Sequence, residues 1–186
     1  QSKTSLNIVR IGTSGSLQKD IPTGSFVVSE FGLGLDGLLH FYNFEENEEE
    51  QTLLDEIIKQ TSYPKTAPKL YLAKGNEALI QQLSSEETYL GITATANGFY
   101  GPQGRQLRLT PKIEGFNDRL SSFSYNNHIV SNLEMETSAL FGLGKLLGHN
   151  CATICLILAN RYNKTFIKDY PGGIDSLIRY VLQRLT

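Results

Sequence analysis

The run C-A-T-I-C-L-I-L-A, residues 151–159, decides the class of fold. It is apolar at almost every position, and an uninterrupted apolar run of this length is typical of a strand buried in the middle of a parallel sheet. The run ends at Asn160-Arg161, and residues 174–185 then carry apolar side chains at helical spacing. The end of the chain is therefore predicted to be a buried strand followed by an amphipathic helix.

The rest of the chain also alternates between predicted strands and predicted helices. Apolar runs rich in β-branched residues predict strands at 7–11, 24–30, 70–73, 92–95 and 129–136. Helical spacing of apolar residues predicts helices at 45–58, 76–83 and 137–147. No internal repeat and no linker divides the chain. We therefore predict one α/β domain over residues 1–186, with a mixed or parallel central sheet flanked by helices.

Two of these helices carry more specific expectations. The acidic run between Glu45 and Glu50 suits the positive end of a helix dipole, so we interpret it as a solvated helix start and not as a metal site. In the helix at 137–147, the residues expected to face the core are Ala139, Leu140, Leu143, Leu146 and Leu147.

Composition and charge exclude several kinds of partner. The net charge is −2 and no basic stripe appears, which argues against nucleic acid and against an anionic membrane surface. The longest apolar run falls far short of the about 20 residues that span a bilayer. Cys151 and Cys155 are predicted to be buried free thiols, because two cysteines provide neither a disulfide framework nor a zinc site. A soluble protein in a reducing cytoplasm, without a metal, fits this pattern.

The stretch G-I-T-A-T-A-N-G-F-Y-G-P-Q-G-R, residues 91–105, predicts a strand that ends in a recognition loop. Loops at strand ends are where α/β sheets usually bind ligands. Phe99, Gln103 and Arg105 provide an aromatic face, an amide and a guanidinium. Together they are suited to stack on a flat ring and to hydrogen-bond its edge, so the loop indicates a site for a planar polar molecule.

Two further segments place polar groups after predicted strands. In R-I-G-T-S-G, residues 10–15, the strand is predicted to turn into a small-residue loop whose backbone N–H groups, with Arg10 and two hydroxyls, suit an anion such as phosphate. A plain glycine-rich turn explains the same letters. In E-M-E, residues 134–136, two carboxylates lie two positions apart, so an extended backbone points both to one side. They are suited to hold a ribose diol, and a helix N-terminus is the alternative interpretation.

Taken together and in this order, the motifs R-I-G-T-S-G, G-I-T-A-T-A-N-G-F-Y-G-P-Q-G-R, N-L-E-M-E-T-S-A-L and I-L-A-N-R resemble the nucleoside phosphorylase family, and its uridine-cleaving members most of all. The resemblance implies reversible phosphorolysis of a pyrimidine nucleoside, giving the free base and ribose 1-phosphate. It further implies an α/β fold, a homo-oligomer that is a dimer or a hexamer, and no cofactor, since phosphate is the co-substrate.

The resemblance also implies a role for each candidate residue. Arg10 and Thr13 would bind phosphate, and Met135 with Glu136 would contact the ribose. The residues that would contact the base are Phe99, Gln103 and Arg105. The residues in supporting places around the nucleoside would be Ser14, Gly15, Glu134 and Arg161. The residues implied to be catalytic are Arg10, Thr13 and Arg105.

The choice of base can be argued from the end of the last apolar strand. Purine phosphorylases of the family carry an aspartate there, whereas this chain has Asn160-Arg161. We therefore expect pyrimidines, and uridine ahead of thymidine if Glu136 holds the 2′-hydroxyl. The alternatives are a purine nucleoside phosphorylase, a hydrolytic nucleosidase of the same superfamily, and a non-catalytic nucleoside-binding or assembly protein.

The resemblance covers the family pattern only in part. Members carry a long segment ahead of the strand that holds Arg10, and that segment supplies further phosphate ligands. Residues 1–186 correspond to about the C-terminal two thirds of the usual family length. We therefore expect the sheet to be incomplete at its N-terminal side, with the remaining segment missing or supplied by another chain. An isolated chain of this length is expected to be inactive.

Overall fold

A mixed sheet occupies the centre of the computed structural model, which describes residues 4–186. The strands found in these residues are β1 (Asn7–Ser16), β2 (Phe26–Gly34), β3 (Tyr71–Lys74), β4 (Thr88–Thr95), β5 (Ser124–Tyr125), β6 (His128–Glu134), β7 (Asn150–Asn160) and β8 (Thr165–Phe166). Their order is β3-β2-β4-β6-β1-β7-β8, and β5 joins through β6. The predicted α/β class with a mixed sheet is confirmed.

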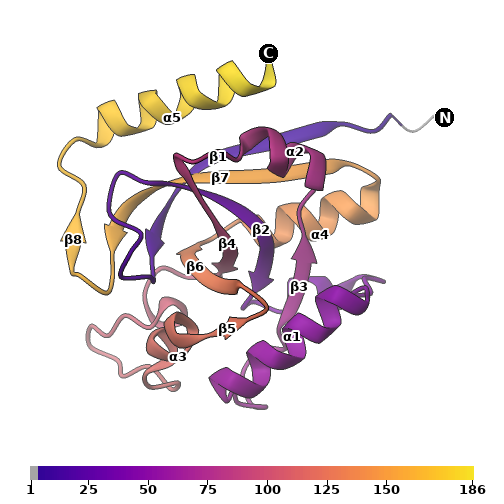
Figure 1. Cartoon of the computed structure of the whole chain (residues 1–186). Coiled ribbons are helices and arrows are strands. Elements are labelled where there is room, and N and C mark those ends of the chain that lie inside the picture. The colour runs from indigo at the N-terminus through magenta and orange to yellow at the C-terminus, as the bar shows by residue number, and fades with distance from the viewer. Residues whose placement is uncertain (1–3) are drawn as a thin grey trace.

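The sheet closes on itself, which the sequence did not indicate. β2 pairs with β7 as well as with β4, so β2, β4, β6, β1 and β7 form a ring of paired strands. Pairing is parallel for β1–β7, β2–β4 and β4–β6, and antiparallel for β1–β6 and β2–β7. Figure 1 shows the shorter strands curling beneath the long β1–β7 pair. The ends of β4, β6 and β1 lie together, because the end of β6 pairs with the ends of both other strands.

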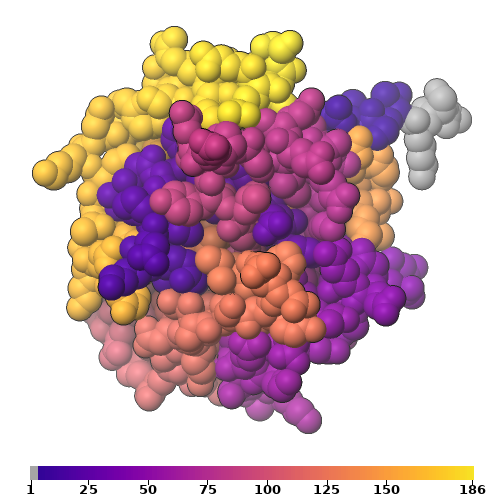
Figure 2. Space-filling view, in the orientation of Figure 1, coloured from indigo at the N-terminus to yellow at the C-terminus, as the bar shows by residue number. Residues whose placement is uncertain are grey.

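Helices cover the outside of this ring. They are α1 (Glu48–Thr61), α2 (Glu77–Leu83), α3 (Phe116–Ser122), α4 (Thr137–Leu147) and α5 (Tyr170–Leu185), with short 3-10 helices η1 (Leu38–Phe41) and η2 (Gly101–Gln103). One apolar cluster joins α2 and α5 to β7, around Leu83, Ile154 and Leu177. Another joins α1 and α3 to the strands, around Ile57 and Leu120. Figure 2 shows α5 as a ridge along one side of the molecule.

The G-T-S-G segment is part of a strand, so the loop predicted there is wrong. β1 pairs with β7 in parallel from Asn7 to Ser16, and the register shifts by a bulge between Ser14 and Gly15. The small residues continue the strand because the mostly buried β7 pairs with them as far as Ser16. A bulge redirects the side chains that follow it, so the end of β1 still changes direction. It does not form the loop whose free backbone N–H groups were predicted to bind an anion.

The buried face of α4 also differs from the prediction. Its buried residues are Thr137, Ser138, Phe141, Gly142 and Gly144, whereas Leu146 and Leu147 are 40% and 62% exposed. A Cβ on Gly32 of β2 would lie 2.6 Å from the Cα of Ser138, and a Cβ on Gly142 would lie 2.0 Å from Leu39. The helix therefore lies close to β2 at Ser138 and close to η1 at Gly142, so small residues occupy these two contacts beside the buried Phe141.

The acidic start of α1 is only partly solvated. Asn47 and Glu50 form a capping box, which the acidic pattern favours. Glu50, however, is fully buried, and its carboxylate accepts hydrogen bonds from the backbone N–H of Lys74 at 2.8 Å and from Lys145 Nζ at 2.7 Å. This carboxylate therefore ties α1 to β3 and α4, and the expectation of a wholly solvated helix start is wrong at this position.

The two thiols are buried and free, as predicted. Cys151 packs with Ala73 and Phe141 beneath α4. The helices of the described residues are all too short or too polar to cross a membrane.

Candidate functional site

Arg10 lies at the centre of the candidate site, on β1. Its guanidinium folds back over its own strand, so that a Cβ on Gly12 would lie 2.5 Å from Arg10 Nη1. Nη1 lies 3.2 Å from Glu134 Oε2 and donates to Cys155 Sγ at 3.3 Å, while Nη2 pairs with Glu136 Oε2. The absence of a side chain at Gly12 is thus what gives the guanidinium its room.

The surroundings of Arg10 favour its charge. Burial alone would lower the pKa of Arg10, but Cys155, Glu134 and Glu136 act against burial and the pKa is raised. Burial raises the pKa of Cys155 to about 12, so its thiol is neutral at pH 7. The anions that face Arg10 at neutral pH are therefore the two carboxylates.

Glu134 is held by what we call the carboxylate clamp, formed by Thr95, Thr137 and the backbone N–H of Glu136. Its carboxylate accepts from Thr95 Oγ1 at 2.6 Å, Thr137 Oγ1 at 2.9 Å, Thr137 N at 2.9 Å and Glu136 N at 3.0 Å. Burial raises the pKa of Glu134, while the donors from Thr95, Arg10, Glu136 and Thr137 act against that rise. Each of these groups donates to the carboxylate of Glu134, so the geometry fits an ionised carboxylate. The clamp joins the ends of β4 and β6 to the start of α4.

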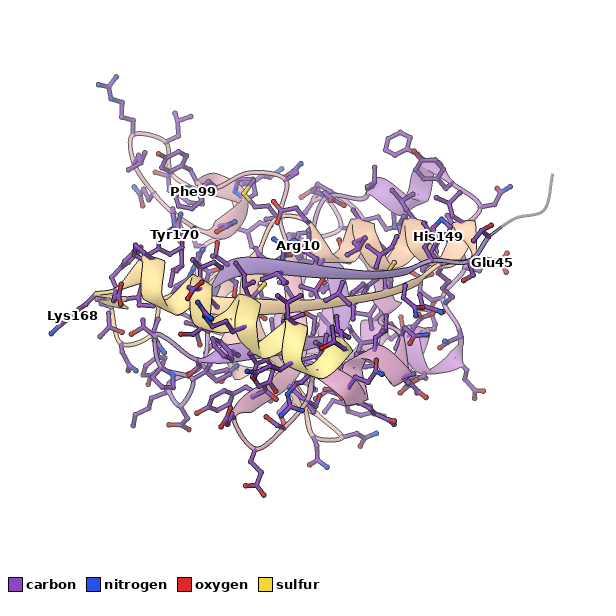
Figure 3. The ribbon with its side chains drawn as sticks, turned by 90° about the horizontal axis from the view of Figure 1, so that it is seen from above. Arg10, Glu45, Phe99, His149, Lys168 and Tyr170 are labelled. Atoms are coloured by element: carbon purple, nitrogen blue, oxygen red, sulfur yellow. The ribbon has the colours of Figure 1, made fainter. Side chains whose placement is uncertain are left out.

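The loop at residues 97–105 follows β4 and differs in character. Arg105 stacks on Phe99, with its Cζ 3.5 Å from the ring centroid, and donates from Nη1 to the Phe99 carbonyl at 3.2 Å. The ring of Tyr100 lies edge-on to Phe99 at 5.4 Å. Phe99 is 52% exposed. Figure 3 shows it toward the C-terminal end of β1, beyond Arg10. This loop presents an aromatic face and a cation to solvent.

Arg161 connects this loop to the end of β1. Its Nη1 donates to the Gln103 carbonyl at 2.8 Å and its Nη2 to Gln103 Oε1. A Cβ on Gly15 would lie 3.1 Å from Arg161 Nε, so the glycine admits the arginine. Burial, and next the charge of Arg105, lower the pKa of Arg161 to about 10. Arg161 is therefore still charged at neutral pH and positions the buried Gln103.

A network of hydrogen bonds between buried polar side chains reaches the same end of β1 from within the ring. Asn132 Nδ2 donates to Ser14 Oγ at 2.8 Å, and Asn132 Oδ1 accepts from Thr93 Oγ1 at 2.8 Å. Thr93 in turn lies 2.5 Å from Ser29 Oγ. These side chains, from β1, β2, β4 and β6, are all buried. This hydrogen-bond network orients the hydroxyl of Ser14, the residue next to Thr13.

The three segments singled out in the sequence meet at this end of the ring, although the first is part of a strand and not the loop that was predicted. Arg10 contacts Glu134 and Glu136, and Gly15 lies against Arg161, which holds Gln103. Glu134 is buried and Met135 is 40% exposed, but the extended backbone ends at Glu134. Met135 and Glu136 form a bend, and Glu136 is the N-cap of α4, so the helix N-terminus, the alternative interpretation of E-M-E, is what the structure has. Thr13 is partly buried. How these residues contact a ligand stays a prediction.

Four residues with clear structural roles here were not found from the sequence: Thr95, Asn132, Thr137 and Ser138. Ser138 N donates to Thr95 Oγ1 at 2.9 Å, which attaches α4 to the clamp. The available signal was the position of Thr95 at the end of an apolar strand and of Thr137-Ser138 directly after E-M-E. Hydroxyl side chains at such junctions commonly satisfy free helix N–H groups or carboxylates. Within residues 4–186, no three His, Cys, Asp or Glu side chains gather in a way that could hold a metal ion.

The fold and the grouping of these motifs are those of a known family. Residues 5–171 match the phosphorylase superfamily, so the chain belongs to it.

The chain is similar to two proteins described as uridine phosphorylase, from Thermococcus kodakarensis and Haemophilus influenzae. It is 26% identical to the first over 169 residues, which cover 86% of this chain and 50% of that protein. It is 26% identical to the second over 155 residues, which cover 82% of this chain and 53% of that protein. The chain thus spans about half the length of these relatives.

Solved structures share the fold. A Trypanosoma brucei nucleoside phosphorylase, described as showing uridine phosphorylase activity, superposes with a TM-score of 0.85 at 24% identity, over 96% of this chain and 62% of that one. An oomycete uridine phosphorylase from Phytophthora capsici superposes with a TM-score of 0.61 at 19% identity, over 99% of this chain and 66% of that one.

Proposed function

We propose that this chain carries the nucleoside-binding part of a phosphorylase that cleaves uridine with phosphate, giving uracil and ribose 1-phosphate. The observation that supports it most is the placement of Arg10 between Glu134 and Glu136, at the end of the ring where Arg161 holds Gln103. A cation for phosphate, a carboxylate for ribose hydroxyls and an aromatic-amide-guanidinium loop for a base then face one site. Similarity to two uridine phosphorylases agrees with this choice.

On the phosphate side, Arg10 and Thr13 are the proposed ligands. Cleavage of an N-glycosidic bond builds positive charge on the sugar, and an anion held below the anomeric carbon stabilises that charge as it attacks. Glu136 pairs with Arg10 at the surface, with 58% of its side chain exposed. It is therefore free to exchange this contact for the ribose hydroxyls, with Met135 beside them. The clamped Glu134 keeps Arg10 in place during that exchange.

On the base side, Phe99, Gln103 and Arg105 are the proposed contacts. Arg161 has only donors, so Gln103 turns its Oε1 toward Arg161 and leaves its Nε2 to donate to a carbonyl oxygen of uracil. Arg105 adds a charge-assisted donor that strengthens as the departing base gains negative charge. Ser14 and Gly15 line the sugar between the two sides. No covalent intermediate with a side chain is needed, because phosphate brings the nucleophile.

The whole protein is proposed to act as a homo-oligomer on nucleoside and phosphate in a reducing cytoplasm, as the family resemblance implies. Because the chain spans about half of its curated relatives, we expect the remaining family segment to complete the phosphate site. The activity of residues 1–186 alone is therefore expected to be low.

The test is phosphorolysis by the whole protein, followed by the absorbance of the released base. Uridine and inosine at equal concentration are compared, each with and without phosphate. We expect uracil release that depends on phosphate and exceeds hypoxanthine release. Faster cleavage of inosine would contradict the pyrimidine assignment, and release that continues without phosphate would indicate a hydrolase.

A further inference from the structure

A large cavity borders the 97–105 loop, and of the residues proposed for the reaction only Arg105 belongs to its lining. Its volume is about 1150 Å³, and it is bounded by residues 63–68 after α1, by η2 and by the chain from Gly104 to Ile113. Its lining includes neither Arg10 nor Glu136. Figure 1 shows the chain that leads into α3 as a loop at the edge of the molecule, and Figure 3 shows Phe99 at the base of a projecting loop.

The walls of the cavity are mainly apolar. Leu35 and Phe116, each 6% exposed, belong both to the lining and to the core cluster beneath it. Leu107 and Leu109 also line the cavity but are 70% and 85% exposed. Exposed leucines gain most from a ligand that covers them, because covering removes apolar surface from water. The other apolar or aromatic lining residues include Tyr63, Pro68, Pro102, Pro111 and Ile113.

The charged residues of the lining have one sign. They are Arg105, Arg108 and Lys112, and none of the described residues that line the cavity is an aspartate or a glutamate. Glu114 follows closely in the chain but does not belong to the lining. Across residues 4–186, none of the ion pairs involves these three cations. An anionic group would meet several free donors at this rim.

We propose that the cavity binds a small apolar carboxylate, a molecule whose hydrocarbon body lies against Leu107, Leu109 and Phe116 and whose carboxylate is bound at the Arg108–Lys112 rim. The volume is somewhat above the range of about 300–1,000 Å³ typical of small-molecule sites, which suits a flexible hydrocarbon chain. A guanidinium binds a carboxylate with two parallel hydrogen bonds, which fixes the orientation of such a ligand. This binding does not depend on the proposed phosphorolysis.

The cavity shares six residues with the 97–105 loop: Asn97, Tyr100, Gly101, Pro102, Gly104 and Arg105. Arg105 is also the residue that stacks on Phe99. A carboxylate that reaches Arg105 therefore competes with the Phe99 ring for the same guanidinium.

Decanoate is the test ligand, and 1-decanol is the uncharged control of the same chain length. Each is titrated calorimetrically into the protein at ligand concentrations below those at which the ligand itself aggregates. We expect saturable binding of decanoate and at least about tenfold weaker binding of decanol. Equal binding of the two would overturn the assignment to a carboxylate. Absence of saturable decanoate binding at millimolar concentration would overturn the site itself.

Three variants locate the binding. Leu109→Glu places a negative charge on a highly exposed wall residue and should weaken decanoate by at least about tenfold. Arg108→Gln should weaken decanoate and leave decanol unchanged. Leu147→Glu is the matched control, an exposed leucine on α4 outside the cavity lining, and should bind decanoate as the unmodified protein does. Unchanged decanoate affinity in Leu109→Glu, or a loss in Leu147→Glu alone, would overturn the proposal.

Discussion

The carboxylate clamp and the 97–105 loop lie at the same end of the ring and are built in opposite ways. In the clamp, Glu134 is 4% exposed and accepts hydrogen bonds from Thr95, Thr137 and a backbone N–H, while Arg10 lies against it. In the loop, the half-exposed Phe99 ring is held by a stack with Arg105 and an edge-on contact with Tyr100. A buried, fully bonded carboxylate costs much to disturb, whereas an exposed stack costs little. The part proposed to handle charge is therefore preorganised, and the part proposed to take the base is adaptable.

The difference between the buried clamp and an exposed contact is tested most directly by removing each carboxylate partner of Arg10 in turn. Glu134→Ala leaves the Thr95 and Thr137 donors and half of Arg10 unsatisfied, so we expect a loss of about 3–5 kcal/mol in the free energy of unfolding. Glu136→Ala removes an exposed pair and should cost no more than about 1 kcal/mol. Urea unfolding of both variants measures the difference. Equal losses would show that the clamp contributes nothing beyond the ion pair.

The loop should show the reverse behaviour. Phe99→Ala should change the free energy of unfolding by less than about 0.5 kcal/mol, because the ring is half exposed. Its removal should weaken uracil binding by about 1–3 kcal/mol through lost stacking. Phe41→Ala, at a ring that is 86% exposed and lies on η1, is the control and should leave uracil binding unchanged. Calorimetric titration of uracil into the two variants measures the difference. Unaltered uracil affinity in Phe99→Ala would contradict the proposal that the base binds at this loop.

The buried neighbour of Arg10 predicts a pH dependence. Burial raises the pKa of Cys155 from 9.0 to about 12. The folded state holds this proton more tightly than the unfolded state does. The contribution of the Cys155 thiol to the free energy of unfolding is therefore fully present below pH 9 and falls by about 1.4 kcal/mol per pH unit as the pH rises toward 12. Burial also raises the pKa of Tyr71, so part of the slope remains in Cys155→Ala. Unfolding free energies across this range should show a smaller slope in the variant, and an identical slope would contradict the prediction.

The smallest effect on binding is expected from the glycine that makes room for Arg10. Gly12→Ala places a Cβ against the guanidinium, which Glu134, Glu136 and Cys155 hold in place, so the cost in unfolding free energy should be about 1–3 kcal/mol. The displaced guanidinium should bind phosphate a few fold more weakly. Gly101→Ala, where a Cβ meets nothing within 4 Å, is the matched control. Phosphate titration compares them, and equal affinities would show that the position of Arg10 is not what phosphate recognises.

The order of helices and strands could be predicted because it follows from local patterns. The caps at Asn47 and Asn76, the apolar run of β7 and the boundaries of α4 all agree with it. The grouping of Arg10, Gln103 and Glu136 was also predictable in outline, since the sequence places all three at or near the ends of predicted strands of one sheet. Arg10 itself lies within β1, because that strand continues to Ser16. The partners of these residues were not predictable, because Thr95 and Asn132 look like ordinary strand residues until neighbouring strands are placed beside them.

The sequence by itself determined the α/β class, the elements and the residue types at the site, because hydrophobic periodicity and helix caps act within a few residues of each other. Only the tertiary structure decided which face of α4 is buried, whether G-T-S-G is loop or strand, and that Glu50 and Glu134 are enclosed. Each of these depends on how closely two distant segments approach. Gly32 against Ser138, β7 beside β1, and Lys145 reaching Glu50 are contacts that no local pattern contains.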